Sequence, residues 1–324
     1  LLNGKPKRTA DLKGLVPSVT FTPDDLELAK GAMSVRRAAL DALGSQLSAN
    51  HYLIRRDYEK VLRHKNRLLK DEAPAALVGA MNETLVTCGA QLSCYRAALF
   101  EKLAASMASY YAEITDGHER LDAGFVPSWE EHDPLSFATR TFGRDEAREA
   151  LADALARRGG EERVRKRALV GPHADRIEFF IDGKNAALFG SQGQQRSVVL
   201  AFKLAEATLI QDFLRQKPVL LLDDVMSELD AARRRALVAF ISGDIQTFIT
   251  TTNLAYFDDD LLGGARIVEL EKPRKTGEMP DEDRMFHVKH SPIDAQPARG
   301  EAEERDGQPS DPAEQPSARI EGDS

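Results

Sequence analysis

The chain has 324 residues, of which 42% are hydrophobic and 30% are charged, so it is long enough for one large or two ordinary globular domains with a real core. It contains no run of about 18 apolar residues, so no membrane-spanning helix is expected. The formal net charge is −8, but residues 271–324 hold 14 acidic and 8 basic residues, so the rest is near balance. This segment is also rich in Pro, Gly, Gln and Ser, which predicts a disordered acidic tail.

The two ends of the sequence and its cysteines indicate the setting of the chain. The N-terminus, Leu1-Leu2-Asn3-Gly4, has no initiator Met and no signal-peptide pattern, which predicts a fragment whose upstream part is missing. The two cysteines, Cys88 and Cys94, are too few for a disulfide framework or a zinc site. We interpret them as free thiols in a reducing cytoplasm.

Residues 1–45 are predicted to be the remainder of a sheet-bearing lobe. Residues 16–21 alternate in polarity as a short strand does. Thr22 is expected to cap the helical segment that follows, with Pro23 at its first position.

Residues 46–165 are predicted to form a helical arm. Apolar residues from Val78 to Leu99 follow one another at spacings of three and four, which is typical of a heptad seam. An earlier apolar stripe, from Ile54 to Leu69, could pair with this seam in an antiparallel manner. An ordinary helical bundle is the alternative and differs little in physical terms.

Residues 166–270 return to a mixed α/β pattern. Asp182-Gly183 predicts a hairpin turn, and a long apolar-faced helix is expected from about Gln192 to Leu214. Strands are expected at 219–222 and 247–250, separated by a helix. This alternation of strands and helices predicts a largely parallel sheet.

The strongest candidate site is the Asp223-Asp224 pair, which follows four apolar residues of a predicted buried strand. In open parallel sheets, ligands bind at the carboxyl ends of the strands. The first carboxylate could hold Mg²⁺ together with water, and the second could orient or deprotonate a water that attacks a phosphate. The plainer interpretation is that such strand-end aspartates cap the next turn.

Two predicted helix starts carry further candidates. The segment from Gly190 to Arg196 opens the long helix, where free amide groups and the helix dipole favour an anion. Gly193 would let a phosphate approach the backbone, while Ser191 and Gln194 could add side-chain hydrogen bonds; a polar helix start is the alternative. The segment Ser227-Glu228-Leu229-Asp230 precedes another helix, and its plainer interpretation is a turn with Asp230 as the N-cap.

In this order, the three segments resemble the signature motif, the Walker B motif and the D-loop of ABC-type ATPases. Their variant forms resemble the RecF family of bacterial recombination-mediator ATPases, with Ser-Gln-Gly-Gln-Gln-Arg as the signature and Asp-Asp in place of Asp-Glu. Further agreement comes from Phe21-Thr22-Pro23-Asp24-Asp25-Leu26, Arg36-Arg37 with Leu40-Asp41, Gly171-Pro172-His173, and Thr250-Thr251-Thr252-Asn253 where most ABC proteins have a switch histidine. The resemblance runs from residue 1 to about 270. It implies an α/β fold, in which an ABC-type ATPase head lobe with a mostly parallel sheet carries an inserted helical arm.

The resemblance also implies roles for individual residues. Asp223 would hold Mg²⁺, Asp224 would be the catalytic carboxylate, and Thr252 would stand at the switch position. Thr22 would fill the role of the glutamine loop. ATP held by a partner subunit would meet residues of the signature motif and D-loop, namely Ser191, Gln192, Gly193, Gln194, Ser227 and Asp230.

The sequence departs from the family pattern in two places. Ala174 and Arg176 stand where RecF-like chains tend to have Arg and Asp. A phosphate loop, Gly-x-x-x-x-Gly-Lys-Ser/Thr, does not occur in the 324 residues, and in the family this loop precedes the region where residue 1 begins. The chain by itself is therefore predicted to bind ATP poorly.

One predicted helix carries seven basic residues, which could neutralise DNA phosphates without reading base sequence. They are Arg55, Arg56, Lys60, Arg63, Lys65, Arg67 and Lys70. A second basic cluster lies at 163–167. The alternative is a solvated helix face, since Asp57 and Glu59 intervene, and the family resemblance favours DNA.

The function that the resemblance implies is ATP-dependent DNA binding in recombinational repair and replication restart, in the cytoplasm. ATP would join two copies into a homodimer that marks gapped DNA, or a junction of single and double strands, for recombinase loading with the mediators RecO and RecR. Slow ATP hydrolysis would open the dimer. Three alternatives stay open: an SMC-type structural DNA ATPase, a transporter ATPase subunit, and a non-catalytic scaffold left by truncation.

Overall fold

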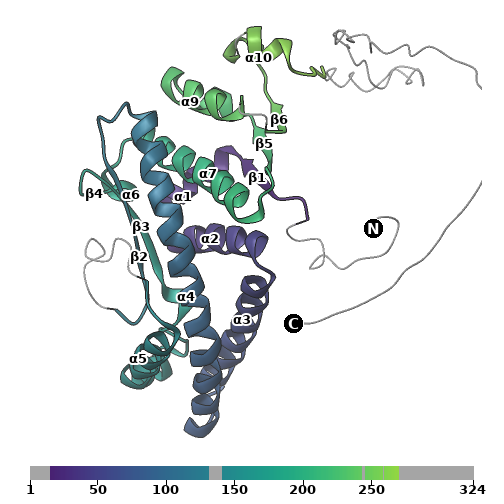
Figure 1. Ribbon diagram of the computed structural model, residues 1–324. Coiled ribbons are helices and arrows are strands. Elements are labelled where there is room, and N and C mark those ends of the chain that lie inside the picture. The colour runs from purple at the N-terminus through teal and green to yellow at the C-terminus, as the bar shows by residue number, and fades with distance from the viewer. Residues whose placement is uncertain (1–14, 131–140, 243–244, 258, 270–324) are drawn as a thin grey trace, which may run out of the picture. The chain divides into compact units, whose positions relative to one another are not determined.

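The computed structural model describes residues 15–130, 141–242, 245–257 and 259–269. The chain divides into two units, Leu1–Asp258 and Asp259–Ser324. The second unit contributes the short helix α10 (Asp259–Gly263) to the described residues, and the predicted tail at 271–324 lies outside them. The other elements labelled in Figure 1 belong to the first unit.

A three-stranded parallel sheet has the order β1 (Ser18–Phe21), β5 (Val219–Asp223), β6 (Thr247–Thr250). Alternate residues of β1 and β5 are buried on one face of this sheet, and the long helix α7 (Gln192–Leu214) packs against β1. The short helices α8 (Val225–Glu228) and α9 (Ala231–Ile241) follow β5. The parallel pairing confirms what the alternation of strands and helices predicted.

A second sheet is antiparallel, with the order β2 (Leu121–Val126), β3 (Arg176–Ile181), β4 (Lys184–Asn185). Asp182 and Gly183 join β3 to β4 with φ angles of 48° and 77°, as the two-residue turn predicted from this pair requires. Strand β2 falls inside the range expected to be the arm, and it pairs with β3 along its whole length. That range is therefore not wholly helical.

Four helices carry the arm and its root. After the short α1 (Glu27–Lys30), these are α2 (Met33–Leu47), α3 (Ala49–Lys70), α4 (Ala75–Ile114) and α5 (Arg144–Arg165). Ser48 separates α2 from α3, and its hydroxyl caps α3 by accepting the His51 amide. Helix α4 has 40 residues, a length of about 60 Å, and contacts α3, α5 and α7 along its course (Figure 1).

The apolar seam of α4 is buried at heptad spacing. Val78, Leu85, Leu92 and Leu99 are all buried, and Leu85 and Leu92 belong to a core cluster shared with Tyr58 of α3 and with apolar residues of α5. The seam thus packs three helices together. Among the described helices, none combines the length and apolar character needed to cross a bilayer.

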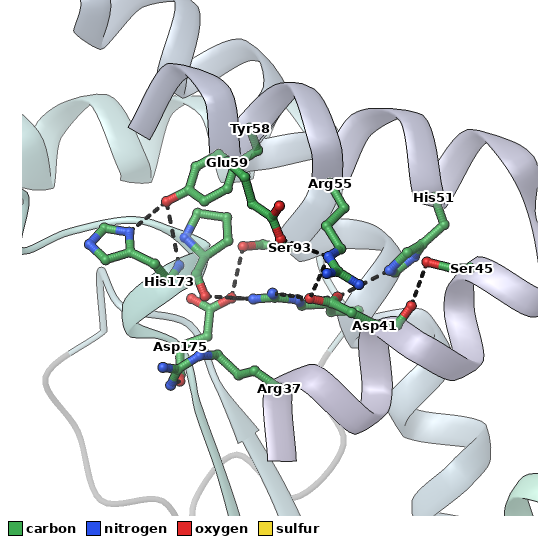
Figure 2. A network of polar contacts seen from close by, with 12 residues as sticks. Arg37, Asp41, Ser45, His51, Arg55, Tyr58, Glu59, Ser93, His173 and Asp175 are labelled. Atoms are coloured by element: carbon green, nitrogen blue, oxygen red, sulfur yellow. Dashed lines mark hydrogen bonds and ion pairs between the residues drawn. The ribbon is translucent and has the colours of Figure 1, made fainter. Parts of the chain in front are cut away.

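A buried polar network joins the root of the arm to the antiparallel sheet, and Figure 2 shows it from close by. At its centre, the Arg96 guanidinium of α4 donates to both carboxylate oxygens of Asp41 in α2, at 2.9 and 2.7 Å. The same guanidinium lies 3.3 Å from the carboxylate of Asp175, just before β3. Arg96 is 4% exposed and Asp175 is fully buried. The guanidinium and the carboxylates therefore form hydrogen bonds and ion pairs with one another instead of with water.

Helix α3 joins the network through two side chains. His51 Nε2 donates to Asp41 Oδ1 at 3.1 Å, and the Tyr58 hydroxyl shares a 2.6 Å hydrogen bond with His173 Nδ1 (Figure 2). His173 lies in the turn η4 (Pro172–Ala174). Gly171 has a φ of 135°, and a Cβ there would lie 2.5 Å from the Tyr58 hydroxyl, so only glycine fits. The Gly171-Pro172-His173 motif is therefore the point at which the sheet lobe meets α3.

The ionisation of the network follows from its burial and its partners. Burial alone would raise the pKa of Asp41, but hydrogen bonds from His51 and Arg96 hold that pKa well below its usual value. Burial lowers the pKa of His173 to about 4. Near neutral pH, Asp41 is therefore an ionised acceptor and His173 an uncharged ring.

Replacing the central cation should destabilise the fold strongly. We expect Arg96→Met to lower the free energy of unfolding by about 3–5 kcal/mol, because it leaves buried carboxylates without their partner. Urea unfolding followed by circular dichroism measures this change. The matched control is Arg158→Met, which removes a partly exposed ion pair with Glu161 and should change stability by less than about 1 kcal/mol; equal losses would contradict the role of Arg96.

Candidate functional site

The Asp223-Asp224 pair lies at the carboxyl end of β5, at the rim of the parallel sheet. Asp223 is the register partner of Thr250, the last residue of β6, and the Thr250 hydroxyl donates to Asp223 Oδ1 at 2.6 Å. The Asp224 amide donates to Thr250 at 3.1 Å, both to its carbonyl and to its hydroxyl oxygen. Thr250 thus holds both aspartates in place, a role that no sequence pattern had suggested.

Asp224 has an unusual backbone and an unsatisfied side chain. Its φ of 49° and ψ of 26° are left-handed, and its carbonyl accepts the Ser227 hydroxyl at 2.8 Å. Its Oδ1 atom is buried and has no hydrogen-bond partner within the described part of the chain. Since an unpaired buried carboxylate oxygen is costly, this atom favours a proton donor or a cation beside it.

The predicted signature turn opens α7 as a reciprocal capping box. The Ser191 hydroxyl accepts the Gln194 amide at 3.2 Å, and Gln194 Oε1 accepts the Ser191 amide at 2.8 Å. Gln194 Nε2 also donates to Glu119 Oε1 at 2.8 Å, so this predicted nucleotide ligand is already engaged inside the chain. Gln192 is exposed, and the first amides of the helix, at Gln192 and Gly193, have no intrahelical partner.

Two arginines hold the segment Ser227–Asp230 against α7. Arg196 of α7 forms an ion pair with Glu228. Asp230 caps α9 by accepting the Arg233 amide at 3.0 Å, and its carboxylate also pairs with the Arg233 guanidinium. Arg233 Nε in turn donates to the Ser197 hydroxyl at 2.8 Å. The predicted signature and D-loop residues are therefore neighbours within one subunit.

Two further residues, Thr252 and Thr22, are expected to face the nucleotide. Thr252 is exposed and lies two residues beyond β6, so its switch role stays a prediction. Thr22 caps the turn η2 (Pro23–Leu26), where its amide donates to the Asp25 carboxylate at 2.7 Å. A cleft of about 50 Å³ lies between this turn and the Arg196–Glu228 pair, so Thr22 adjoins the D-loop segment.

Five of the seven basic residues expected to bind DNA are exposed on α3. Their spacings of four, three, four and three place them along one side of the helix. We call this set the basic stripe; it consists of Arg56, Lys60, Arg63, Arg67 and Lys70. Arg55 is half-buried, with its guanidinium 2.8 Å from Glu59 and 3.8 Å from Asp41, so it belongs to the network at the arm root instead.

The prediction that Lys65 binds DNA is wrong. Its side chain is fully buried and pairs with the equally buried Glu162 of α5 at 2.6 Å. Lys65 lies seven residues after Tyr58 and four before Leu69, both buried, so it occupies the inner side of α3. That heptad relation to Tyr58 was visible in the sequence and could have excluded Lys65 from the surface set.

A buried carboxylate lies beside β1. Glu206 of α7 is 7% exposed and lies 4.0 Å from Lys203, whose ammonium group also contacts Asp25 at 2.9 Å and donates to the Thr20 carbonyl at 2.7 Å. Burial raises the pKa of Glu206 to about 7. Its protonation therefore changes within the physiological range.

Known proteins resemble this chain in sequence and in fold. No family model matches the sequence. The DNA replication and repair protein RecF of Lactobacillus delbrueckii subsp. bulgaricus is 36% identical over 265 residues, covering 80% of this chain and 68% of the relative. RecF of Rippkaea orientalis is 35% identical over 281 residues, covering 82% and 71%. A solved structure of the recombination mediator protein RecF-ATPrS has a TM-score of 0.69 and 31% sequence identity, and the match covers 78% of this chain and 67% of the solved one. A solved structure of RecF-ATP has a TM-score of 0.68 and 32% identity, and the match covers 77% of this chain and 66% of the solved one.

The fold and the rim of carboxylates define an ABC-type ATPase head lobe with an inserted helical arm, as the motifs predicted. The two curated relatives are more than 30% identical to this chain, and the matched region covers more than two thirds of the length of each. This similarity identifies one family within the class. The chain belongs to the RecF family.

Stability should depend on pH through Glu206. The folded state raises the pKa of this carboxyl from 4.5 to about 7, so its protonated form stabilises the fold and that contribution is lost as pH rises through this window. Relative to Glu206→Gln, the wild type should lose up to about 1.4 kcal/mol per pH unit. Unfolding free energies measured from pH 5 to 8 test this, with the exposed Glu101→Gln as control; parallel curves for wild type and Glu206→Gln would refute it.

Proposed function

We propose that the protein is an ATP-dependent DNA-binding protein of replication and repair, which dimerises on ATP to mark gapped DNA for recombinase loading. The observation that carries the proposal is the likeness to RecF proteins over four fifths of the chain. A structure solved as RecF-ATP in the RecFOR pathway has a similar fold. The mediators RecO and RecR are the proposed protein partners. In this proposal residues 1–45 and 166–270 form the ATPase lobe, and 46–165 form the arm that meets DNA.

The rim residues fit Mg²⁺ as part of a nucleotide site. The described residues contain no group of three or more His, Cys, Asp or Glu side chains that could hold a metal ion. Asp223 is exposed and the Asp224 Oδ1 atom lacks a partner in the described range. Mg²⁺ characteristically takes one or two carboxylates and completes its shell with phosphate oxygens and water, so Asp223 is its proposed ligand. A bound Mg²⁺ would neutralise negative charge on the transferred phosphate.

Asp224 is the proposed catalytic carboxylate. Its unsatisfied oxygen can accept a hydrogen bond from a water molecule and orient that water toward a γ-phosphate. Thr250 fixes the Asp224 amide and the Asp223 carboxylate together, which supports a positioning role for it. Thr252, two residues further on, is the proposed switch residue.

The signature turn is proposed to face ATP held by the second subunit. The amides of Gln192 and Gly193 and the positive end of the α7 dipole suit a phosphate, and the Ser191 hydroxyl retains a proton to donate. Ser227 and Asp230 would line the same interface. The matched region spans 68% and 71% of the two curated relatives. The form used in the tests below is the chain lengthened at its N-terminus by a phosphate loop, called the upstream-extended protein. In this proposal each ATP site combines residues of two copies.

The basic stripe of α3 is proposed to contact the DNA backbone. Such contacts neutralise phosphates without reading bases, which suits a protein that recognises a gap or a junction by shape. Asp57 and Asp71 pair with Arg56 and Arg67. Lys60 and Arg63 in the middle of the stripe are therefore its proposed principal contacts.

Removing the Asp224 charge should separate ATP binding from hydrolysis. In the upstream-extended protein, Asp224→Asn should keep the ATP-bound dimer and reduce hydrolysis by at least about 100-fold, because the amide cannot deprotonate or hold the water as a carboxylate does. Phosphate release and light scattering measure the two properties. The control is Asp212→Asn, an exposed aspartate on α7, which should hydrolyse ATP normally; unchanged hydrolysis in Asp224→Asn would refute the catalytic role.

Neutralising the middle of the stripe should weaken DNA binding. Lys60→Gln with Arg63→Gln should lower affinity for duplex DNA uniformly across sequences and reduce the slope of log K against log salt by about two. Fluorescence anisotropy at several salt concentrations measures this. Arg120→Gln with Lys184→Gln removes two exposed charges, one just before β2 and one in β4. An equal loss in this pair would show that net charge, not the stripe, matters.

A further inference from the structure

The glycine of the signature turn is covered by an arginine side chain from α9. A Cβ added to Gly193 would lie 3.2 Å from Arg233 Nη2, 3.6 Å from Nη1 and 3.7 Å from Cζ. The guanidinium group therefore lies against the backbone of Gly193. The absence of a side chain at this position makes room for Arg233, in addition to any room it leaves for a phosphate.

Arg233 is held in that position by partners from both segments. Its Nε atom donates to the buried Ser197 hydroxyl, one turn into α7, and its guanidinium pairs with the Asp230 carboxylate. Its side chain is 16% exposed, against 54% for Asp230. A long cationic side chain loses conformational freedom and hydration when it is fixed in this way, and capping of α9 does not require it, because the Arg233 amide already fills that role.

The two arginines that follow Arg233 point elsewhere. Arg234 lies over the Tyr256 ring at 4.9 Å, and Arg235 lines a cavity of about 420 Å³ with Tyr110 and Phe240. Of these three successive arginines, Arg233 is the one whose described contacts reach the first turn of α7. The contact is therefore specific to one position and does not reflect the general charge of α9.

We propose that Arg233 is a positioning residue that couples the D-loop segment to the signature turn. When the partner subunit contacts the exposed Asp230, the Asp230–Arg233 pair transmits that contact to Gly193 and Ser197, and so sets the amides of the first turn of α7. The inference rests on the proposed function, since it assumes that this turn receives a phosphate from across the dimer. Arg233 acts through the turn and does not itself touch the nucleotide.

A set of substitutions in the upstream-extended protein tests this coupling. Arg233→Gln should leave the ATP affinity of a single subunit within about twofold, because Arg233 is not among the residues proposed to bind ATP within that subunit. It should reduce ATP-dependent dimerisation and hydrolysis by about 10- to 100-fold. Arg233→Lys should not restore them, since one ammonium group cannot contact Ser197, Asp230 and Gly193 together. Arg235→Gln is the matched control and should behave as wild type.

A double-mutant cycle distinguishes positioning from general stability. Gly193→Ala should impair dimerisation in the wild-type background. Combined with Arg233→Gln it should cost less than the sum of the two separate losses, because its Cβ then meets no guanidinium and only its effect on the phosphate remains. Additive effects, normal dimerisation of Arg233→Gln, or a lowered melting temperature that accounts for its loss would each overturn the inference. If the wild-type protein fails to dimerise with ATP, the proposed function itself fails; if it dimerises and Arg233→Gln does also, only the coupling fails.

Discussion

A guanidinium group that leaves water needs acceptors on every side, and Arg96 finds them on separate segments of the chain. Asp41 lies in α2, and Asp175 and the Pro172 carbonyl lie around the turn before β3. Because an unmatched buried charge is far more costly than a matched one, alternative packings of these segments are disfavoured. The network therefore acts mainly as a constraint on geometry. It fixes the roots of α3 and α4 against the antiparallel sheet. Because the basic stripe lies on α3, these contacts also set the direction in which the stripe faces.

The candidate site depends on a different constraint, the register of a parallel sheet. Pairing of Asp223 with Thr250 brings two chain segments 27 residues apart into one hydrogen bond. Helix α7 then links this sheet to the arm, because it packs on β1 and also contacts α4, where Thr208 meets Tyr110 at 2.7 Å. The rim, the signature turn and the arm are thus connected through packed elements. A change at any one of them has a physical route to the others.

Local patterns predicted the elements well. The Asp182-Gly183 turn, the long helix from Gln192 to Leu214, the heptad seam of α4 and the apolar strand before Asp223 all follow from short-range chemistry, and each is present. Strand β2 was missed because its sequence, Leu-Asp-Ala-Gly-Phe-Val, has weak alternation and is specified by pairing with β3, some 55 residues further along. Thr250 and Arg233 were missed for a related reason. Their roles come from contacts across the sheet and between helices, which no spacing within one segment reveals.

The left-handed backbone of Asp224 bears on how this kind of site can change in evolution. Short polar side chains tolerate that conformation, whereas longer ones are held there at a penalty of about 1–2 kcal/mol. The Asp-Asp form of the motif is therefore matched to the bend that follows β5. There the Ser227 hydroxyl donates to the Asp224 carbonyl, and the Asp224 amide donates to the Thr250 hydroxyl. A change of Asp224 to glutamate would lengthen the side chain and add a backbone penalty of about 1–2 kcal/mol at the bend. Glu72, Lys166 and Arg215 already carry this penalty elsewhere in the fold, with φ angles of 52°, 53° and 53°. The turn after β5 therefore favours the shorter carboxylate through its backbone, before any contact of the side chain is considered.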